Sequence, residues 1–211
     1  MNTNSIFWLG VLGVVLFVGI TILGGFLFPA YSHVAQFISE SYATGTTYGS
    51  YLRYAGFIPS GILMALFLFL VPTVLPKSGL VKIAFWGIGL FYGLGTVVTG
   101  LFPCDIGCNP EFIDPSISQF IHNISGFLTY LIVPWCILAL GFKAKTWPNG
   151  KNISLITLLF GLIAICFVFV FFSDPNSNLK GLYQRIIEGS ILYWMLTMAF
   201  YIKNKSLLIS S

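Results

Sequence analysis

The feature that most constrains this chain is a set of six apolar stretches, each about as long as a membrane-crossing helix. A helix that spans a bilayer needs about 20 mostly apolar residues. A strand of a transmembrane barrel is about half as long and alternates apolar with polar residues, which these stretches do not. The predicted spans are Ile6 to Leu27, Leu52 to Leu75, Leu80 to Leu101, Phe120 to Phe142, Ile153 to Phe172, and Gln184 to Ile202.

The composition leaves little room for anything except these spans. Of the 211 residues, 57% are apolar and 8% are charged, whereas a soluble domain carries about 25% charged residues. A soluble fold of this size cannot hide so much apolar surface. We therefore expect an all-α membrane protein, a six-transmembrane-helix bundle that forms a single domain over residues 1-211. The first span is too long for a signal peptide and no basic residue precedes it, so we expect it to be retained.

The charged residues predict how the bundle is oriented. All six acidic residues fall on one side of the predicted membrane, together with only three of the ten basic residues. Because lysine and arginine prefer short cytoplasmic loops, we expect the other side, with both termini, to be cytoplasmic. The basic residues are dispersed and form no patch, so nucleic acid is not an expected partner. The basic residues of the cytoplasmic side are Lys77, Lys82, Lys143, Lys145, Lys151, Lys203 and Lys205.

The first outer loop has the periodicity of a short helix. At helical spacing, His33, Gln36 and Glu40 share one face, and apolar residues share the neighbouring face. This pattern predicts a short interfacial helix whose apolar side faces lipid or the other helices. Two interpretations of its polar side stay open. His33 and Glu40 point into a site, or they form the solvated face of an ordinary amphipathic helix.

Further polar side chains occur near the outer ends of three spans. Span four carries a stripe of polar residues at helical spacing, span two begins with Arg53, and span six begins with three polar residues. Ionisable groups inside spans usually face the bundle interior or a wet cavity, so we expect an outward-facing polar pocket. The stripe consists of Ser118, His122, Ser125 and Thr129, and the start of span six contributes Gln184, Arg185 and Glu188.

Structural roles are the alternative for the same residues. Arg53 and Arg185 have side chains long enough to reach the headgroups. Arg185 and Glu188 are three residues apart on one helix, which suits a packing pair. His122 also fits a hydrogen-bonded histidine of the core.

Two cysteines, Cys104 and Cys108, flank a short segment of the second outer loop. We expect a disulfide between them, because the outer side is oxidising in a bacterial envelope and Gly107 permits a sharp turn. The alternative is a zinc site completed by His33 and His122. The spacing of the cysteines is looser than that of common zinc sites, so we expect neither a metal nor another cofactor. The remaining cysteines, Cys136 and Cys166, fall within spans and are expected to be buried thiols.

Several segments together resemble a prokaryotic membrane family, domain of unknown function family 998. These are Tyr31-Ser-His-Val-Ala-Gln-Phe-Ile-Ser-Glu, Phe102-Pro-Cys-Asp-Ile-Gly-Cys, His122, and Gly181-Leu-Tyr-Gln-Arg-Ile. The resemblance covers nearly the whole chain. It implies a compact six-helix bundle in a prokaryotic cytoplasmic membrane, and it carries no biochemical activity.

Three functions remain as hypotheses. In the first, the pocket binds a lipid headgroup or an anionic small molecule, gripped by Arg53 and Arg185 with His33 and His122 as hydrogen-bond partners. An accessory role beside a membrane-protein partner belongs to the same class.

The second hypothesis is a hydrolase-type enzyme. Here His122 or His33 acts as general base, Asp105, Glu40 or Glu188 orients it, and an arginine stabilises negative charge. The third is a small transporter, which the absence of an evident broken mid-membrane helix disfavours.

Overall fold

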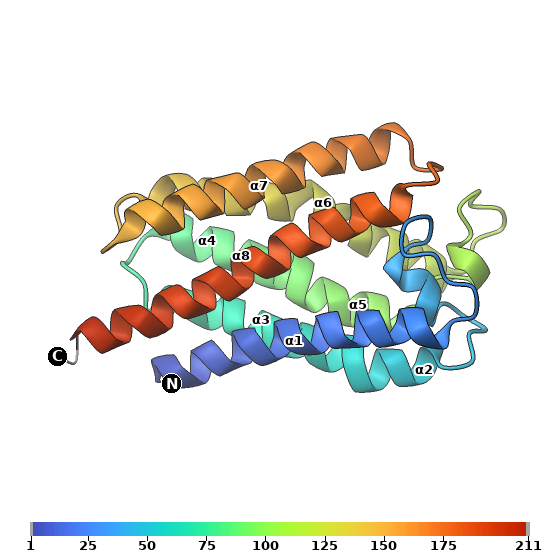
Figure 1. Cartoon of the computed structure of the whole chain (residues 1–211), viewed down its shortest axis with the longest axis horizontal. Helices are drawn as coiled ribbons and strands as arrows, with labels where there is room; N and C mark the ends of the chain where they lie inside the picture. Colours follow the sequence, from blue (N-terminus) through green and yellow to red (C-terminus); the bar gives the residue numbers. More distant parts are fainter. Residues whose placement is uncertain (1, 210–211) are drawn as a thin grey trace.

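The computed structural model describes the backbone of residues 2–209 and the side chains of residues 2–204. In this part of the chain six long helical rods run alternately up and down as one bundle (Figure 1). The first rod begins at the end of the bundle where the last rod ends. The rods are α1 (Thr3–Leu27), a second rod of α2 (Gly49–Leu52), η2 (Arg53–Phe57), α3 (Ile58–Leu70) and η3 (Val71–Thr73), a third of α4 (Gly79–Ile88), η4 (Gly89–Leu94) and α5 (Gly95–Leu101), and then α6 (Ile117–Ala144), α7 (Gly150–Ser173) and α8 (Lys180–Ile209).

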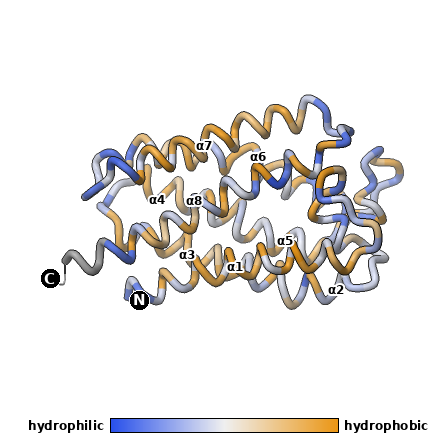
Figure 2. The backbone as a smooth tube through the Cα atoms, in the orientation of Figure 1, coloured by the Kyte–Doolittle hydropathy of each residue, from blue (hydrophilic) through white to orange (hydrophobic). Residues whose placement is uncertain are grey.

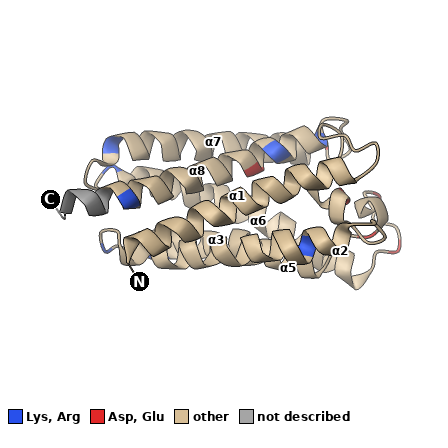
Figure 3. Cartoon of the chain, turned by 60° about the horizontal axis from the view of Figure 1, so that its bottom comes forward, with Lys and Arg blue, Asp and Glu red and all other residues tan. Residues whose placement is uncertain are grey.

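Five of the rods are long and apolar enough to cross a membrane. They are the first five predicted spans, and the chain is a multi-span membrane protein. Apolar residues follow the rods, whereas hydrophilic residues collect toward the two ends of the bundle (Figure 2). The last rod, α8, is the longest helix but is not among these five, and its first turns carry polar residues such as Lys180, Arg185 and Glu188. Lys and Arg lie mainly at one end, and acidic residues mainly in the loops of the other (Figure 3).

The second and third rods approach each other closely through small residues. A Cβ atom added to Gly61 would lie 2.8 Å from the carbonyl oxygen of Gly93, and one added to Gly93 would lie 2.6 Å from the Cα of Ala65. Close backbone approach through glycine and alanine is a common way to pack membrane helices, where apolar association has no advantage over lipid.

Two turns of π-helix interrupt these same rods, and the sequence analysis did not predict them. The π turns are η2 in the second rod and η4 in the third. A π turn inserts one residue and leaves local carbonyl groups without their usual partners, and such turns often occur at functional sites. Two hydroxyls of α6 compensate for η4, because Thr129 Oγ1 donates to the carbonyl of Phe91 and Ser125 Oγ donates to that of Gly95 at 3.3 Å.

The first outer loop differs from its predicted interfacial helix. It contains one turn of 3-10 helix, η1 (Ile38–Tyr42), and all five of its residues are buried. The loop therefore folds into the mouth of the bundle instead of lying along its surface. Within it, Gln36 Nε2 donates to Glu40 Oε2 at 2.9 Å, as their shared face suggested.

Candidate functional site: an outer chamber and its vestibule

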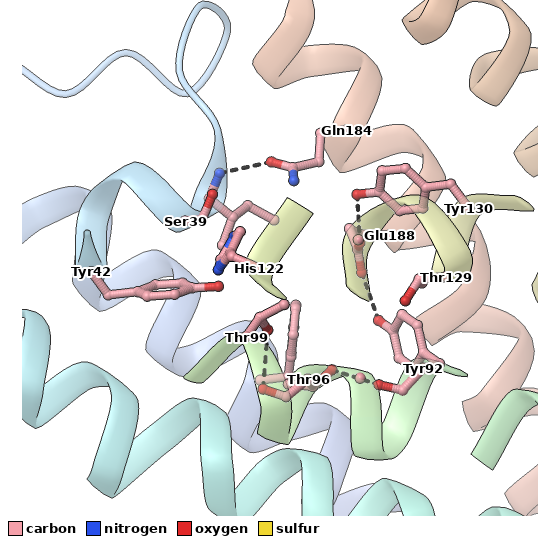
Figure 4. Close-up of a pocket in the computed structure, with 14 residues that line it drawn as sticks. Ser39, Tyr42, Tyr92, Thr96, Thr99, His122, Thr129, Tyr130, Gln184 and Glu188 are labelled. Atoms are coloured by element: carbon pink, nitrogen blue, oxygen red, sulfur yellow. Dashed lines mark hydrogen bonds between the residues drawn. The ribbon is translucent and has the colours of Figure 1, made fainter. Parts of the chain in front are cut away.

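A small polar cavity, here called the chamber, lies where η1 meets the third rod, α6 and α8. Figure 4 shows its tyrosine, threonine and histidine side chains converging from these separate segments. Its volume is about 80 Å³, which is room for a few water molecules or one small polar group. The polar residues that line it are Ser39, Tyr42, Tyr92, Thr96, Thr99, His122, Thr129, Tyr130, Gln184 and Glu188.

Among the described residues that line the chamber, Glu188 is the one that carries a carboxyl group. Tyr92 donates its hydroxyl to Oε2 at 2.7 Å, and Tyr130 donates its hydroxyl to Oε1 at 2.8 Å (Figure 4). Each carboxylate oxygen therefore has one neutral O–H donor. No ion pair with a basic side chain is found for Glu188 in the described part of the chain, so the two tyrosines are the hydrogen-bond partners of its carboxyl group.

His122 is held on the opposite wall of the chamber. Its Nδ1 lies 3.0 Å from the carbonyl oxygen of Phe102, at the end of α5. Because a carbonyl oxygen only accepts, Nδ1 must carry the proton of this bond. The imidazole is 9% exposed and lies beside Tyr42, with ring centroids 6.3 Å apart.

The rest of the polar stripe on α6 connects helices. Ser118 Oγ donates to the carbonyl of Pro103 at 2.6 Å. Ser125 and Thr129 serve the carbonyls around η4, as described above. Every member of the stripe thus contacts a backbone carbonyl of the third rod or of the segment that follows it, while His122 and Thr129 also line the chamber. The main role of the stripe is therefore to join α6 to the third rod by hydrogen bonds from side chains to backbone carbonyls; this set of contacts is here called the seam.

A larger cavity, here called the vestibule, adjoins the chamber at the end of the bundle that carries the disulfide loop. It has a volume of about 460 Å³ and shares five lining residues with the chamber, so little separates the two. The remaining walls include five phenylalanines and come from the edge of η1, the disulfide loop, α6 and the end of α7. No lysine or arginine lines either cavity among the described residues. The shared residues are Ser39, His122, Gly126, Tyr130 and Gln184.

The predicted disulfide between Cys104 and Cys108 is confirmed, with the two Cα atoms 4.8 Å apart. Cys108 lines the vestibule. Gln119, which is fully buried, holds the disulfide loop in place. Its Oε1 accepts from the backbone N–H of Asp105 at 2.7 Å, and its Nε2 donates to the carbonyl of Cys108 at 3.2 Å. The bonded cysteines are not free as metal ligands, and no three histidine, cysteine or acidic side chains gather in the described ranges. Both cysteines within spans were expected to be buried, but Cys136 is only half-buried and Cys166 is exposed on the outside of the bundle.

Of the predicted site residues, the structure brings His122, Gln184 and Glu188 together in the chamber. Gln184 positions η1, because its Oε1 accepts from the backbone N–H of Ile38 at 2.7 Å. Arg53 lies outside the chamber and the vestibule, with its guanidinium 3.4 Å from the carbonyl of Gly100.

Arg185 fastens the first outer loop to α8. Its Nη1 donates to the carbonyls of Gln36 at 2.8 Å and Gly181 at 2.9 Å, and its Nη2 donates to the hydroxyl of Tyr31 at 2.6 Å. Burial raises the pKa of the Tyr31 phenol, although the neighbouring guanidinium opposes this shift. His33 packs edge-on against Tyr31, with centroids 5.1 Å apart, and its ring covers the face of α1 at Gly25.

The two remaining acidic candidates stabilise loops. Glu40 Oε1 accepts from the backbone N–H of Phe37 at 2.9 Å. Asp105 accepts from the hydroxyl of Ser116 at 2.5 Å and from its backbone N–H at 3.0 Å, at the start of α6. These hydrogen bonds hold the pKa of the Asp105 carboxyl below its usual value.

The three tyrosines of the chamber, Tyr42, Tyr92 and Tyr130, were not among the predicted site residues. Tyr92 and Tyr130 lie within apolar spans and were counted with their hydrophobic neighbours. A signal was available, since a buried tyrosine hydroxyl usually finds a polar partner. Two tyrosines at mid-span and one glutamate in another span could therefore have been predicted to form a hydrogen-bonded cluster.

A family model described as "Protein of unknown function (DUF998)" matches residues 11–201. This range includes every residue of the chamber. No curated protein and no solved structure matches the chain.

Proposed function

The chain belongs to the DUF998 family, and we propose that its outer chamber binds the ammonium group of an amine. The ammonium group contacts Glu188, Tyr92 and Tyr130 in the chamber, and an apolar or aromatic body occupies the vestibule. The observation that carries the proposal is a carboxyl group held by two tyrosines, with no lysine or arginine among the described residues that line either cavity.

Charge balance supports a cationic ligand. An ionised side chain inside a membrane protein is costly and normally has a partner of opposite charge. Glu188 has only two neutral donors, so a bound cation supplies the missing charge. The aromatic rings add to this, because the face of a tyrosine or phenylalanine attracts cations. Tyr42, Tyr92, Tyr130 and Phe17 all line the chamber.

The two volumes suit the two parts of such a molecule. The chamber, at about 80 Å³, takes an ammonium group and little more. The vestibule, at about 460 Å³, falls within the range of about 300 to 1,000 Å³ typical of small-molecule sites. Its walls include Phe37, Phe127, Phe171 and Phe172, which complement an apolar body.

The other hypotheses fit the chamber less well. An anion grip requires Arg53 and Arg185, and neither lines it. A hydrolase requires a nucleophile beside His122, but the Ser39 hydroxyl pairs with Cys108 Sγ at 3.3 Å, at the disulfide. A transporter needs a path through the bundle. Beyond Glu188 on α8, the fully buried Trp194 lies in a packed apolar core, which argues against such a path.

We also propose that α8 crosses the membrane as a sixth span, with both termini cytoplasmic and the chamber open to the outside. The basic residues at one end of the bundle support this orientation (Figure 3). α8 packs between α7 and α1 along the bundle, as the other rods do.

Calorimetry on the purified protein tests the amine site. The probes are 2-phenylethylamine, 2-phenylethanol and 3-phenylpropionate, which share a ring and differ in the charge of the end group. A charge-assisted contact contributes about 1.5 to 3 kcal/mol, so the amine should bind at least about tenfold more tightly than the alcohol, and the carboxylate most weakly.

Two variants and one control locate the site. Glu188→Gln should abolish the preference for the amine, and Gly126→Phe should block binding, because a Cβ at Gly126 points into open space shared by both cavities. Glu111→Gln, at an exposed carboxylate of the second outer loop, should bind as the unchanged protein does. Equal binding of all three probes, or amine binding that survives Glu188→Gln, would overturn the proposal.

A further inference from the structure

A third cavity, here called the lateral groove, lies between α1 and α8 and has a volume of about 300 Å³. Its apolar floor includes Val18 and Ile22 of α1 and Leu192 of α8. Val18 is 40% exposed and Ile22 is 50% exposed, so the groove opens on the side of the bundle that faces lipid. It is therefore placed to hold an apolar chain from the bilayer.

Glu188 lines both the lateral groove and the chamber, together with Phe17 and Ile38. Glu188 is thus part of the wall between them. A group in the groove and a group in the chamber can both lie beside the same carboxylate. The proposed amine site therefore adjoins two cavities, the vestibule from the outer face and the groove from the lipid.

The outer part of the groove carries groups that suit an anion. Arg185 lines it and makes its three hydrogen bonds to neutral acceptors, which leaves further N–H donors on a guanidinium that forms no ion pair with a described residue. The ring nitrogens of His33 have no hydrogen-bond partner among the described residues, and Thr21 Oγ1 is buried without one. A buried hydroxyl without a partner is costly, so a ligand that supplies one is favoured.

We infer that the lateral groove binds a zwitterionic aminophospholipid. This inference rests on the proposed amine site and names the source of the amine. The ammonium group contacts Glu188, the phosphate contacts Arg185 and His33, and an acyl chain follows Val18, Ile22 and Leu192.

The placement of Arg185 and Glu188 supports a headgroup that carries both charges. The two residues are three apart on α8, which places them on one face of the helix, and both line the lateral groove. No ion pair joins Arg185 to Glu188 in the described structure, so each charge is available to one end of the headgroup.

Gly189 provides a selective block of the groove. It lines the groove and is exposed, and a Cβ added to it meets no atom within 4 Å. Gly189→Phe therefore fills the groove without altering the chamber or vestibule, which Gly189 does not line. Gly19→Phe is the matched control, because Gly19 also has open space around it but lies outside the groove.

The test is native mass spectrometry of the detergent-solubilised protein with an equimolar mixture of phosphatidylethanolamine, phosphatidylcholine and phosphatidylglycerol with identical acyl chains. We expect phosphatidylethanolamine to be retained about tenfold over the other two. Gly189→Phe and Glu188→Gln should remove this preference, and Gly19→Phe should keep it. Binding of 2-phenylethylamine to Gly189→Phe should be unchanged.

The outcomes separate the two proposals. Retention of the three lipids in equal amounts, or preference that survives Gly189→Phe, overturns the lipid inference even when the amine probe binds. If the protein without substitutions does not bind the amine probe, the proposed function is overturned, and with it the role of Glu188 in this inference. Selective loss of phosphatidylethanolamine in Gly189→Phe, with normal amine binding, supports both.

Discussion

Tyr92 donates its hydroxyl to Glu188 at 2.7 Å, joining a π turn of the third rod to the last helix across 96 residues of sequence. Tyr130 of α6 completes the arrangement from the other side. The carboxyl group of Glu188 is thus held by donors from two other helices. Those helices must be packed in their final positions before the carboxylate is solvated.

Removal of either tyrosine hydroxyl should destabilise the bundle. Tyr92→Phe leaves Glu188 with one donor, and a hydrogen bond to a charged group is worth about 1.5 to 3 kcal/mol. Tyr130→Phe should cost a similar amount, measured by thermal or denaturant unfolding in detergent. Tyr201→Phe is the control, because its hydroxyl bonds to the carbonyl of Pro148 at an exposed position. Equal small losses in all three variants would show that Glu188 does not depend on these donors.

The proposed orientation predicts which positions a membrane-impermeant thiol reagent reaches in intact cells. With Cys136 and Cys166 replaced by serine, Asp174→Cys should be labelled from outside, and Lys145→Cys only after permeabilisation. The reason is the preference of lysine for the cytoplasmic side. Labelling of position 145 in intact cells would show that the bundle has the opposite orientation, with the chamber open to the cytoplasm.

The first five spans were predictable because each is a continuous apolar stretch whose length is set by the bilayer. The polar stripe on α6 was also visible, but its role was not. Ser125 and Thr129 bond to carbonyls around the π turn η4, and nothing in the local sequence indicated that turn. The stripe therefore suggested a cavity wall where the structure has mainly a seam.

The first outer loop shows the same limit. Helical spacing correctly paired Gln36 with Glu40. The burial of η1 depends on partners far along the chain, such as Gln184, which binds the backbone N–H of Ile38. Local periodicity cannot reveal contacts across 146 residues, so it predicted a surface helix.

Loss of the disulfide should destabilise the outer end of the bundle moderately. Closing a five-residue loop is worth about 2 kcal/mol in the chain-entropy account. Cys104→Ser combined with Cys108→Ser should therefore lower the unfolding free energy by about that amount, with weaker amine binding because Cys108 lines the vestibule. Cys166→Ser, at an exposed free cysteine, should change neither. Unaltered stability of the double variant would show that Gln119 alone holds the loop.

Asp105 should make stability depend on pH at the acidic end. Ser116 lowers the pKa of this carboxyl in the folded protein, so the folded state binds the proton less tightly than the unfolded state does. The stabilising contribution is complete above the ordinary aspartate pKa and is lost as the pH falls through the lower folded value. Asp105→Asn and Ser116→Ala should both reduce the dependence of the melting temperature on pH between about pH 5 and pH 3. If both variants keep the same pH dependence of the melting temperature in this range, that dependence arises from other carboxyl groups.

The last prediction concerns Arg185 and Glu188, which are neighbours on α8 but bind different partners. Arg185→Ala removes the bonds to Gln36 and Tyr31 and should cost about 1 to 3 kcal/mol by loosening the first outer loop. Glu188→Gln should not rescue this loss, because the guanidinium does not neutralise the carboxylate. In a double-mutant cycle the coupling should stay within about 0.5 kcal/mol, the value for a helix pair three residues apart. Recovery of most of the loss in the double variant would instead identify a buried ion pair, and Glu188 would then have no free charge for an amine.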